Sequence, residues 1–317
     1  WLANPHVLRR TSPVQVGLWV LLGSLAISYA ATGFRVLTEE ESAGALRAAL
    51  VMFPLVIVAL AIAATAEISR SDLLLATILI GATFSALVAL AQFASPFDFA
   101  QLIQPPGMTA REMGSGSRGA FFRVRGASAH PIELGVISGA VLPLGMHFTR
   151  FASTHNRRVA SAIATVVLFL SIPMSVSRSG VLIALVAVAL YSAVLTVRQR
   201  LNLVIIGVMS AVLLRAAIPG LLGTVTSTFR GISTDDSISG RTDDYAVIEG
   251  FFEQAPVFGQ GLGTFRPDLY FFLDNQYLMS LVEGGIIGVL GILAFFVLAA
   301  ASARGAGGRC GGCAPGR

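Results

Sequence analysis

The stretch LLLATILIGATFSALVALAQFA at residues 73–94 contains no Asp, Glu, Lys or Arg. About 20 consecutive apolar residues are enough to cross a bilayer as a helix. Seven further stretches are similar, of which four are free of charge and three carry one charge each. They are 14–34, 48–66, 159–176 and 179–197, and then 131–149 (Glu133), 201–219 (Arg215) and 276–300 (Glu283). We therefore predict an all-α fold, a polytopic integral membrane helix bundle with about eight transmembrane helices.

The composition excludes a soluble all-α protein. Only 12% of the 317 residues are charged and the mean hydropathy is +0.77, whereas soluble domains carry roughly 25% charged residues. All 22 basic residues are Arg, and the formal net charge is +5. A GC-rich genome would explain the absence of Lys, but guanidinium groups also bind phosphate oxygens bidentately. We expect phosphate-bearing partners or membrane lipids, and no nucleic acid.

Arginines are dense in the short loops on one side of the predicted bundle. These segments are 1–13, 67–72, 150–158, 198–200 and 301–317. Such density is typical of the cytoplasmic side, which places the two long loops, 95–130 and 220–275, on the outside. The predicted domains are a seven-span bundle over 1–219, a large periplasmic or extracellular loop over 220–275, a last transmembrane helix over 276–300, and a Gly/Arg-rich tail over 301–317.

The loop 220–275 contains the pattern of an amphipathic helix. Thr242 is a suitable N-cap, and Tyr245, Ile248 and Phe252 share one face before Pro256 ends the helix. We expect this helix to lie against the outer membrane surface.

Ionisable residues in or beside the predicted spans gather at the outer side. Arg178 lies in the tight turn between two spans, Arg215 lies four residues from an outer end, and Glu283 is about two turns below the surface. Charged residues inside membrane segments are costly and indicate function. Snorkelling of interfacial side chains is the alternative for Arg215. The set predicts a polar pocket that opens outward.

Four segments resemble the O-antigen ligase and Wzy-type polysaccharide polymerase superfamily. They are RGASAHPIELG (125–135), SVSRSG (175–180), SGRTDDYAVIEGFFEQAPVFGQGLGTF (239–265) and LDNQYLMSLVEGGIIGVLG (273–291). The resemblance implies glycan transfer from an undecaprenyl-diphosphate-linked oligosaccharide donor to an acceptor hydroxyl at the outer face of the plasma membrane. The acceptor would be a glycan, a lipid or a protein. It also implies a metal-independent membrane glycosyltransferase of the bacterial inner membrane, multi-pass, with its active site facing the periplasm or exterior and with no cofactor.

Site residues follow from the same resemblance. Arg178 and Arg241 would hold the diphosphate, and Asp274 would accept the proton from the attacking hydroxyl. Many ligases of the family have His at the position of Asp274, so this chain departs from the standard pattern. Further candidates for substrate binding are Arg266, Arg215, Glu283, Arg125 and His130.

Simpler roles stay open for several of these residues. Arg241 would alternatively pair with Asp243 or Asp244, Asp274 would cap the last span, and His130 would be a loop residue. A transporter or flippase for lipid-linked glycans or other anions is the alternative function, although we find no internal repeat of the kind that marks many transporters. A non-catalytic assembly factor is a further alternative.

The two ends of the chain are unusual. It begins with Trp1 rather than Met, and a Gly/Arg tail stands where the family continues with further spans. We therefore expect a fragment whose C-terminal part is missing or altered. Cys310 and Cys313 form a lone C-x-x-C in this tail, which is weak evidence for a metal site.

Overall fold

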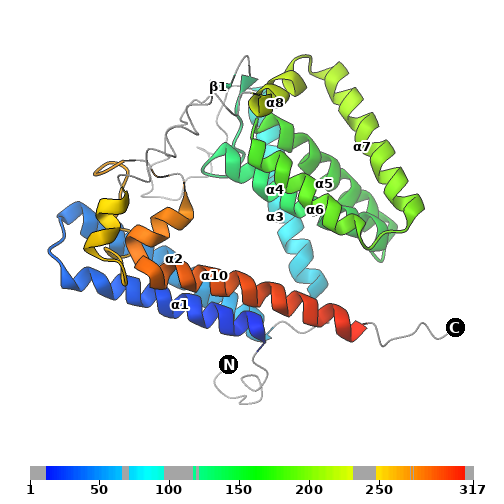
Figure 1. The fold of residues 1–317 in the computed structure, drawn as a ribbon. Coiled ribbons are helices and arrows are strands. Elements are labelled where there is room, and N and C mark those ends of the chain that lie inside the picture. Colours follow the sequence, from blue (N-terminus) through cyan, green and yellow to red (C-terminus); the bar gives the residue numbers. More distant parts are fainter. Residues whose placement is uncertain are drawn as a thin grey trace. The chain divides into compact units, whose positions relative to one another are not determined.

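The computed structural model describes residues 12–65, 71–95, 117–118, 121–230, 248–271, 273 and 275–310 (Figure 1). The chain divides into two compact units. Unit 1 comprises Trp1–Ile68 and Asp235–Arg317, and unit 2 comprises Ser69–Thr234. Each unit is described by itself below.

Unit 1 is built from three long helices. They are α1 (Pro13–Ala31), which the 3₁₀ turn η2 (Thr32–Phe34) follows, α2 (Glu39–Thr65), and α10 (Gln276–Cys310). Ser12 begins α1 with a reciprocal capping box to Gln15, which satisfies two N–H groups of the first turn. Residues 248–254 form a further helical segment.

Helices α1 and α10 pack closely and antiparallel, as Figure 1 shows. Small residues line their contact. A Cβ on Gly291 would lie 2.2 Å from Ser24 Oγ, and one on Gly17 would lie 3.2 Å from the Phe295 Cα. Farther along, the Ser28 hydroxyl donates to the Glu283 carbonyl oxygen at 2.8 Å. Contacts between small residues are how apolar helices approach in lipid, where burial of apolar surface drives no association.

In the residues that the structure describes, unit 2 contains six helices and one short antiparallel strand pair. The helices are α3 (Ser71–Ala94), α4 (Pro131–Phe151), α5 (His155–Met174), α6 (Arg178–Ser192), α7 (Val197–Ala217) and α8 (Leu221–Arg230). The strands are β1 (Ser117–Arg118) and β2 (Phe121–Phe122). Leu79, Leu142 and Leu168 form the core between α3, α4 and α5. Helices α4 and α6 touch backbone to backbone, because a Cβ on Gly180 would lie 2.7 Å from the Gly135 Cα.

The predicted fold class is confirmed. Within the described part of the chain, seven helices are long and apolar enough to cross a membrane, namely α1, α2, α3, α4, α5, α7 and α10. The eighth predicted span is α6, which is apolar but has only 15 residues. The chain is a multi-pass membrane protein. The predicted domain boundaries stay a prediction, because grouping by contact does not tell which segments lie in the bilayer.

The predicted outer loop 220–275 contains more helix than the sequence indicated. Helix α8 occupies its start, and its buried residues Leu221 and Val225 are spaced four apart on one face. Of the predicted amphipathic helix, residues 248–254 are helical and Ile248 is buried. The proposed cap Thr242 and the residue Tyr245 lie outside the described residues.

Candidate functional site

Helix α10 is interrupted at Gly285, where φ is 60° and ψ is −158°. Essentially only glycine adopts this conformation. Segment 256–261 lies against the interruption and bonds to the backbone groups that the helix leaves open. Four hydrogen bonds join them: Ile286 N to Pro256 O (3.0 Å), Ile287 N to Val257 O (3.3 Å), Gln260 N to Val282 O (2.8 Å) and Gly261 N to Glu283 O (2.9 Å). Non-helical backbone within a span is thereby satisfied by the protein itself, as a bilayer requires.

Glu283 holds the glycine-rich turn 259–263 through its side chain as well. Its Oε1 accepts a hydrogen bond from the Phe265 N–H at 3.3 Å. Three glycines of the turn, Gly259, Gly261 and Gly263, have positive φ values of 72°, 115° and 73°. The turn therefore passes so close to α10 that a Cβ on Gly259 would lie 2.3 Å from the Glu283 carbonyl carbon. The same close approach requires glycine at 285, where a Cβ would lie 2.7 Å from the Gly259 N.

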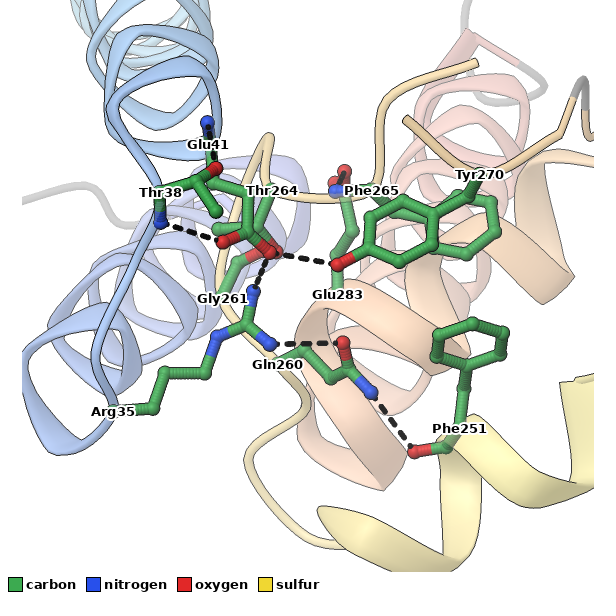
Figure 2. Close-up of polar contacts among 10 residues, drawn as sticks. All are labelled: Arg35, Thr38, Glu41, Phe251, Gln260, Gly261, Thr264, Phe265, Tyr270 and Glu283. Atoms are coloured by element: carbon green, nitrogen blue, oxygen red, sulfur yellow. Dashed lines mark hydrogen bonds and ion pairs between the residues drawn. The ribbon is translucent and has the colours of Figure 1, made fainter. Parts of the chain in front are cut away.

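A second polar cluster joins the α1–α2 turn to the same loop (Figure 2). Glu41 forms a capping box with Thr38, in which the Thr38 N–H donates to Glu41 Oε2 at 2.9 Å. The Arg35 guanidinium pairs with Glu41 Oε1 and donates to Gln260 Oε1 at 3.1 Å. Glu41 is only 4% exposed, so its charge depends on Arg35 for compensation.

Tyr270 completes this cluster from the segment that precedes α10. Its hydroxyl donates to Glu41 Oε1 at 2.8 Å, and its ring stacks on Phe265 with centroids 5.0 Å apart. Phe251 meets both rings edge-on. Burial raises the pKa of the Tyr270 phenol, and the Glu41 carboxylate that accepts its proton raises this pKa further.

Arg266 is also engaged inside unit 1. It forms an ion pair with Asp268, and its Nη1 donates to the Glu40 carbonyl oxygen at 3.3 Å. The hydrogen bond from Arg266 lowers the pKa of Asp268 and raises that of Arg266 in turn. In unit 1, therefore, both Arg35 and Arg266 are compensated by carboxylates of the same unit.

The turn between α5 and α6 in unit 2 is strained at Val176. This residue has φ of 45° and is 1% exposed. A β-branched residue with positive φ costs on the order of 1–3 kcal/mol and persists only where packing imposes it. Ser177 caps α6 by accepting from the Gly180 N–H, and Arg178 is the first residue of that helix. Such strain often occurs at functional sites.

Arg123 reaches the same turn from the segment before α4. Its Nε donates to the Ser175 carbonyl oxygen at 3.3 Å. The segment is fixed by Gln92 of α3, which is 3% exposed. The Gln92 side chain accepts from the Arg125 and Gly126 N–H groups (3.2 and 2.8 Å) and donates to the Gly126 carbonyl oxygen at 3.1 Å. Arg123 thus contacts the turn that precedes Arg178, and the two arginines belong to one corner of unit 2.

The predicted site residues fall in both units. In unit 2, Arg178 begins α6, Arg125 is 8% exposed beneath Gln92, Arg215 is exposed in the last turn of α7, and His130 caps α4 by accepting from the Ile132 N–H at 3.2 Å. In unit 1, Glu283 and Arg266 both contact the loop before α10. Arg241 and Asp274 lie outside the described residues. None of the proposed roles is tested by these placements.

Comparison with known families bears directly on this region. Residues 163–293 match the family model described as O-antigen ligase. The resemblance to the O-antigen ligase and Wzy-type superfamily is confirmed. The match covers the strained turn at Val176, the glycine-rich turn and the interruption of α10. It supports a general role in glycan transfer of the ligase or polymerase type, with a lipid-linked glycan donor and an acceptor in a membrane. Neither a curated protein nor a solved structure matches the chain.

Sequence analysis missed the residues that hold the ligase-family loops in place. They are Arg35, Glu41, Gln260 and Tyr270 in unit 1, and Gln92 and Arg123 in unit 2. The T-x-x-E spacing of Thr38 and Glu41 was a readable signal for a helix start, but nothing in it pointed to residues more than 200 positions away. Among the described residues, no group of three or more His, Cys, Asp and Glu side chains is placed to hold a metal ion. The expected absence of a cofactor stays a prediction.

Proposed function

We propose that this protein transfers a glycan from an undecaprenyl-diphosphate-linked donor to an acceptor hydroxyl at the outer face of the plasma membrane, as a polymerase or ligase. The observation that carries the proposal is the corner of unit 2 where Arg123 bonds to Ser175 O beside Arg178, the first residue of α6. It lies in or against the segment that matches the O-antigen ligase family. A helix N-terminus and guanidinium groups together attract phosphate.

The chemistry is a displacement at the anomeric carbon of the donor sugar. The acceptor oxygen forms the new glycosidic bond, the bond from that carbon to the phosphate oxygen breaks, and the electron pair leaves with the lipid diphosphate. Arg178 and Arg241 stabilise the charge that develops on the leaving group, with Arg123, Arg266 and Arg215 as further candidates. Asp274 accepts the proton of the acceptor hydroxyl.

Glu283 acts indirectly in this scheme. Its side chain and main chain hold the glycine-rich turn and the Phe265 N–H, so it fixes the backbone that leads into the segment before α10. We expect substitution of Glu283 to disturb that backbone rather than to remove a group that touches substrate.

The direct test uses purified protein in nanodiscs with a lipid-diphosphate oligosaccharide, a chelator and no nucleotide. Laddered or acceptor-linked product is expected, and Arg178→Ala should reduce its rate by at least about a hundredfold, the scale of losing one preorganised charge-stabilising group. Arg157→Ala is the matched control, because Arg157 is exposed at the other end of the same unit. Retained transfer in Arg178→Ala and Arg241→Ala would reject the assignment. Uptake of the oligosaccharide into vesicles without bond formation would favour a transporter.

A further inference from the structure

A hollow of about 210 Å³ lies at the end of unit 2 opposite the Val176 turn. It is bordered by α4, by the end of α6 and by the start of α7. Its polar lining consists of Arg150, Tyr191, Gln199 and Asn202, and its apolar lining includes Met146 and Ile206. The site is therefore amphiphilic, with hydrogen-bond donors on one part and hydrocarbon on the other.

The segments that line the hollow are strongly cationic. Residues 144–158 and 191–203 contain Arg150, Arg157, Arg158, Arg198 and Arg200 and no Asp or Glu. Two of these arginines are used by the fold, because Arg158 donates to Ala152 O and Arg200 donates to the carbonyls that end α6. Arg150 differs from them. Its guanidinium lies over the Phe151 ring, 5.2 Å from the centroid, and it neither donates a hydrogen bond to the described residues nor forms an ion pair with them.

The side chains of α7 beside this hollow are mostly exposed, so lipid acyl chains can pack against them. Only Leu214 is buried among the residues of α7, whereas eight residues of α5 are. Val204, Ile206 and Val208 are each more than half exposed, with Val204 and Val208 on one face of the helix and Ile206 on the opposite face. Figure 1 shows α7 standing apart from α4, α5 and α6 along most of its length. In a bilayer, acyl chains must cover these surfaces.

We propose that the hollow binds the headgroup phosphate of an anionic phospholipid, whose acyl chains lie along α7. Arg150 supplies the charge for the phosphate, while Gln199, Asn202 and the Tyr191 hydroxyl supply neutral hydrogen bonds to phosphate and glycerol oxygens. The charge of the site favours an anionic lipid over a zwitterionic one, because no described carboxylate lies on the lining to attract a choline or amine group. On the predicted orientation this lipid belongs to the cytoplasmic leaflet.

The bound lipid would join α7 to α4 and α6, helices that the protein itself joins to α7 only weakly. Its headgroup would contact α4, α6 and α7 at once, and its chains would fill the space beside α7. Binding only to the folded state stabilises that state, so anionic lipid should hold α7 against the rest of unit 2. This inference does not depend on the proposed glycan transfer.

The experiment measures lipid binding to delipidated, detergent-purified full chain by native mass spectrometry and by thermal shift. Phosphatidylglycerol is compared with phosphatidylcholine of the same acyl chains, and glycerol phosphate tests the headgroup alone. We expect phosphatidylglycerol to raise the melting temperature and phosphatidylcholine to leave it nearly unchanged. Arg150→Gln should weaken phosphatidylglycerol binding about tenfold, as expected on losing a charge-assisted hydrogen bond, whereas Arg157→Gln should not.

Several outcomes would overturn the proposal. They are equal binding of the two phospholipids, equal losses in Arg150→Gln and Arg157→Gln, or glycerol phosphate binding as tightly as the intact lipid. If Arg150→Gln does not fold, Asn202→Leu tests the same hollow with its charge kept. It should weaken phosphatidylglycerol binding by a smaller factor, and unchanged binding there would also count against the site.

Discussion

The glycine-rich turn of unit 1 and the turn before α6 of unit 2 adopt positive φ at different kinds of residue. In unit 1 the turn 259–263 and the α10 interruption use Gly259, Gly261, Gly263 and Gly285, for which positive φ costs little. In unit 2 the turn before α6 forces positive φ on a buried valine, Val176. Glycine adopts positive φ readily by itself, whereas packing imposes positive φ on Val176. Strain therefore marks the turn beside Arg178 and not the turn beside Glu283.

The arginines of the two units also differ in the groups that their guanidiniums contact. Arg35 and Arg266 of unit 1 form ion pairs with Glu41 and Asp268, whereas Arg123 of unit 2 donates to a main-chain carbonyl. The ion pairs of Arg35 and Arg266 hold the loop before α10 in unit 1, and the hydrogen bond of Arg123 holds the turn before α6 in unit 2.

The largest expected effect comes from Gly285→Ala. The new Cβ would lie 2.4 Å from Val257 O in a conformation that Ala scarcely adopts, which should destabilise unit 1 by about 3 kcal/mol or more. Gly207→Ala in α7 is the control, since nothing lies within 4 Å of its added Cβ. Thermal unfolding in detergent compares the two variants. Similar melting temperatures would contradict the bonding of segment 256–261 to α10.

Glu41→Ala should have the second largest effect and lower the free energy of unfolding by about 2 kcal/mol. Breaking a buried ion pair costs 3–5 kcal/mol, and this is reduced here because the Arg35 side chain is 31% exposed to solvent. Glu39→Ala, an exposed position in the same helical turn, should have almost no effect. A double-mutant cycle with Arg35→Ala isolates the coupling, and additive losses would show that the pair does not stabilise the cluster.

The strain at Val176 can be tested by asking which of two substitutions leaves the protein more stable. Val176→Gly removes more side chain than Val176→Ala but also relieves the positive φ, so it should be the more stable of the two by about 1 kcal/mol. Val167 in the helix α5 is buried and has no positive φ. There Gly should be worse than Ala by about 1 kcal/mol. The same order at both positions would refute strain at Val176.

Tyr270→Phe should have the smallest effect, about 1 kcal/mol near neutral pH, because it removes one hydrogen bond to Glu41. The folded-state pKa of Tyr270 is raised, so this contribution is complete below the unfolded pKa of about 10 and is lost as pH rises through the folded value. The wild-type advantage should therefore vanish in strongly alkaline buffer. Melting temperatures of both proteins between pH 7 and 11 check this, and a constant difference would disprove it.

Apolar stretches predicted the helices well because a bilayer imposes one length on every span. All eight predicted stretches are helical, and the boundaries of α3 and α4 differ from the prediction by about two residues. The partners of Glu283 and Glu41 could not be predicted from the sequence, because Phe265 and Tyr270 contact them only once the chain has folded. The Val176 strain could not be predicted either, because valine by itself avoids that conformation.

The sequence by itself determined that this chain is a helical membrane protein that resembles the O-antigen ligases, because hydropathy and ordered short motifs are local properties. Only the tertiary structure decided which groups the guanidiniums of Arg35 and Arg123 contact and which backbone segments are strained. Both depend on groups far apart in the chain, such as Arg35 with Gln260 and Arg123 with Ser175. No local pattern specifies such distances, because they result from how whole helices pack.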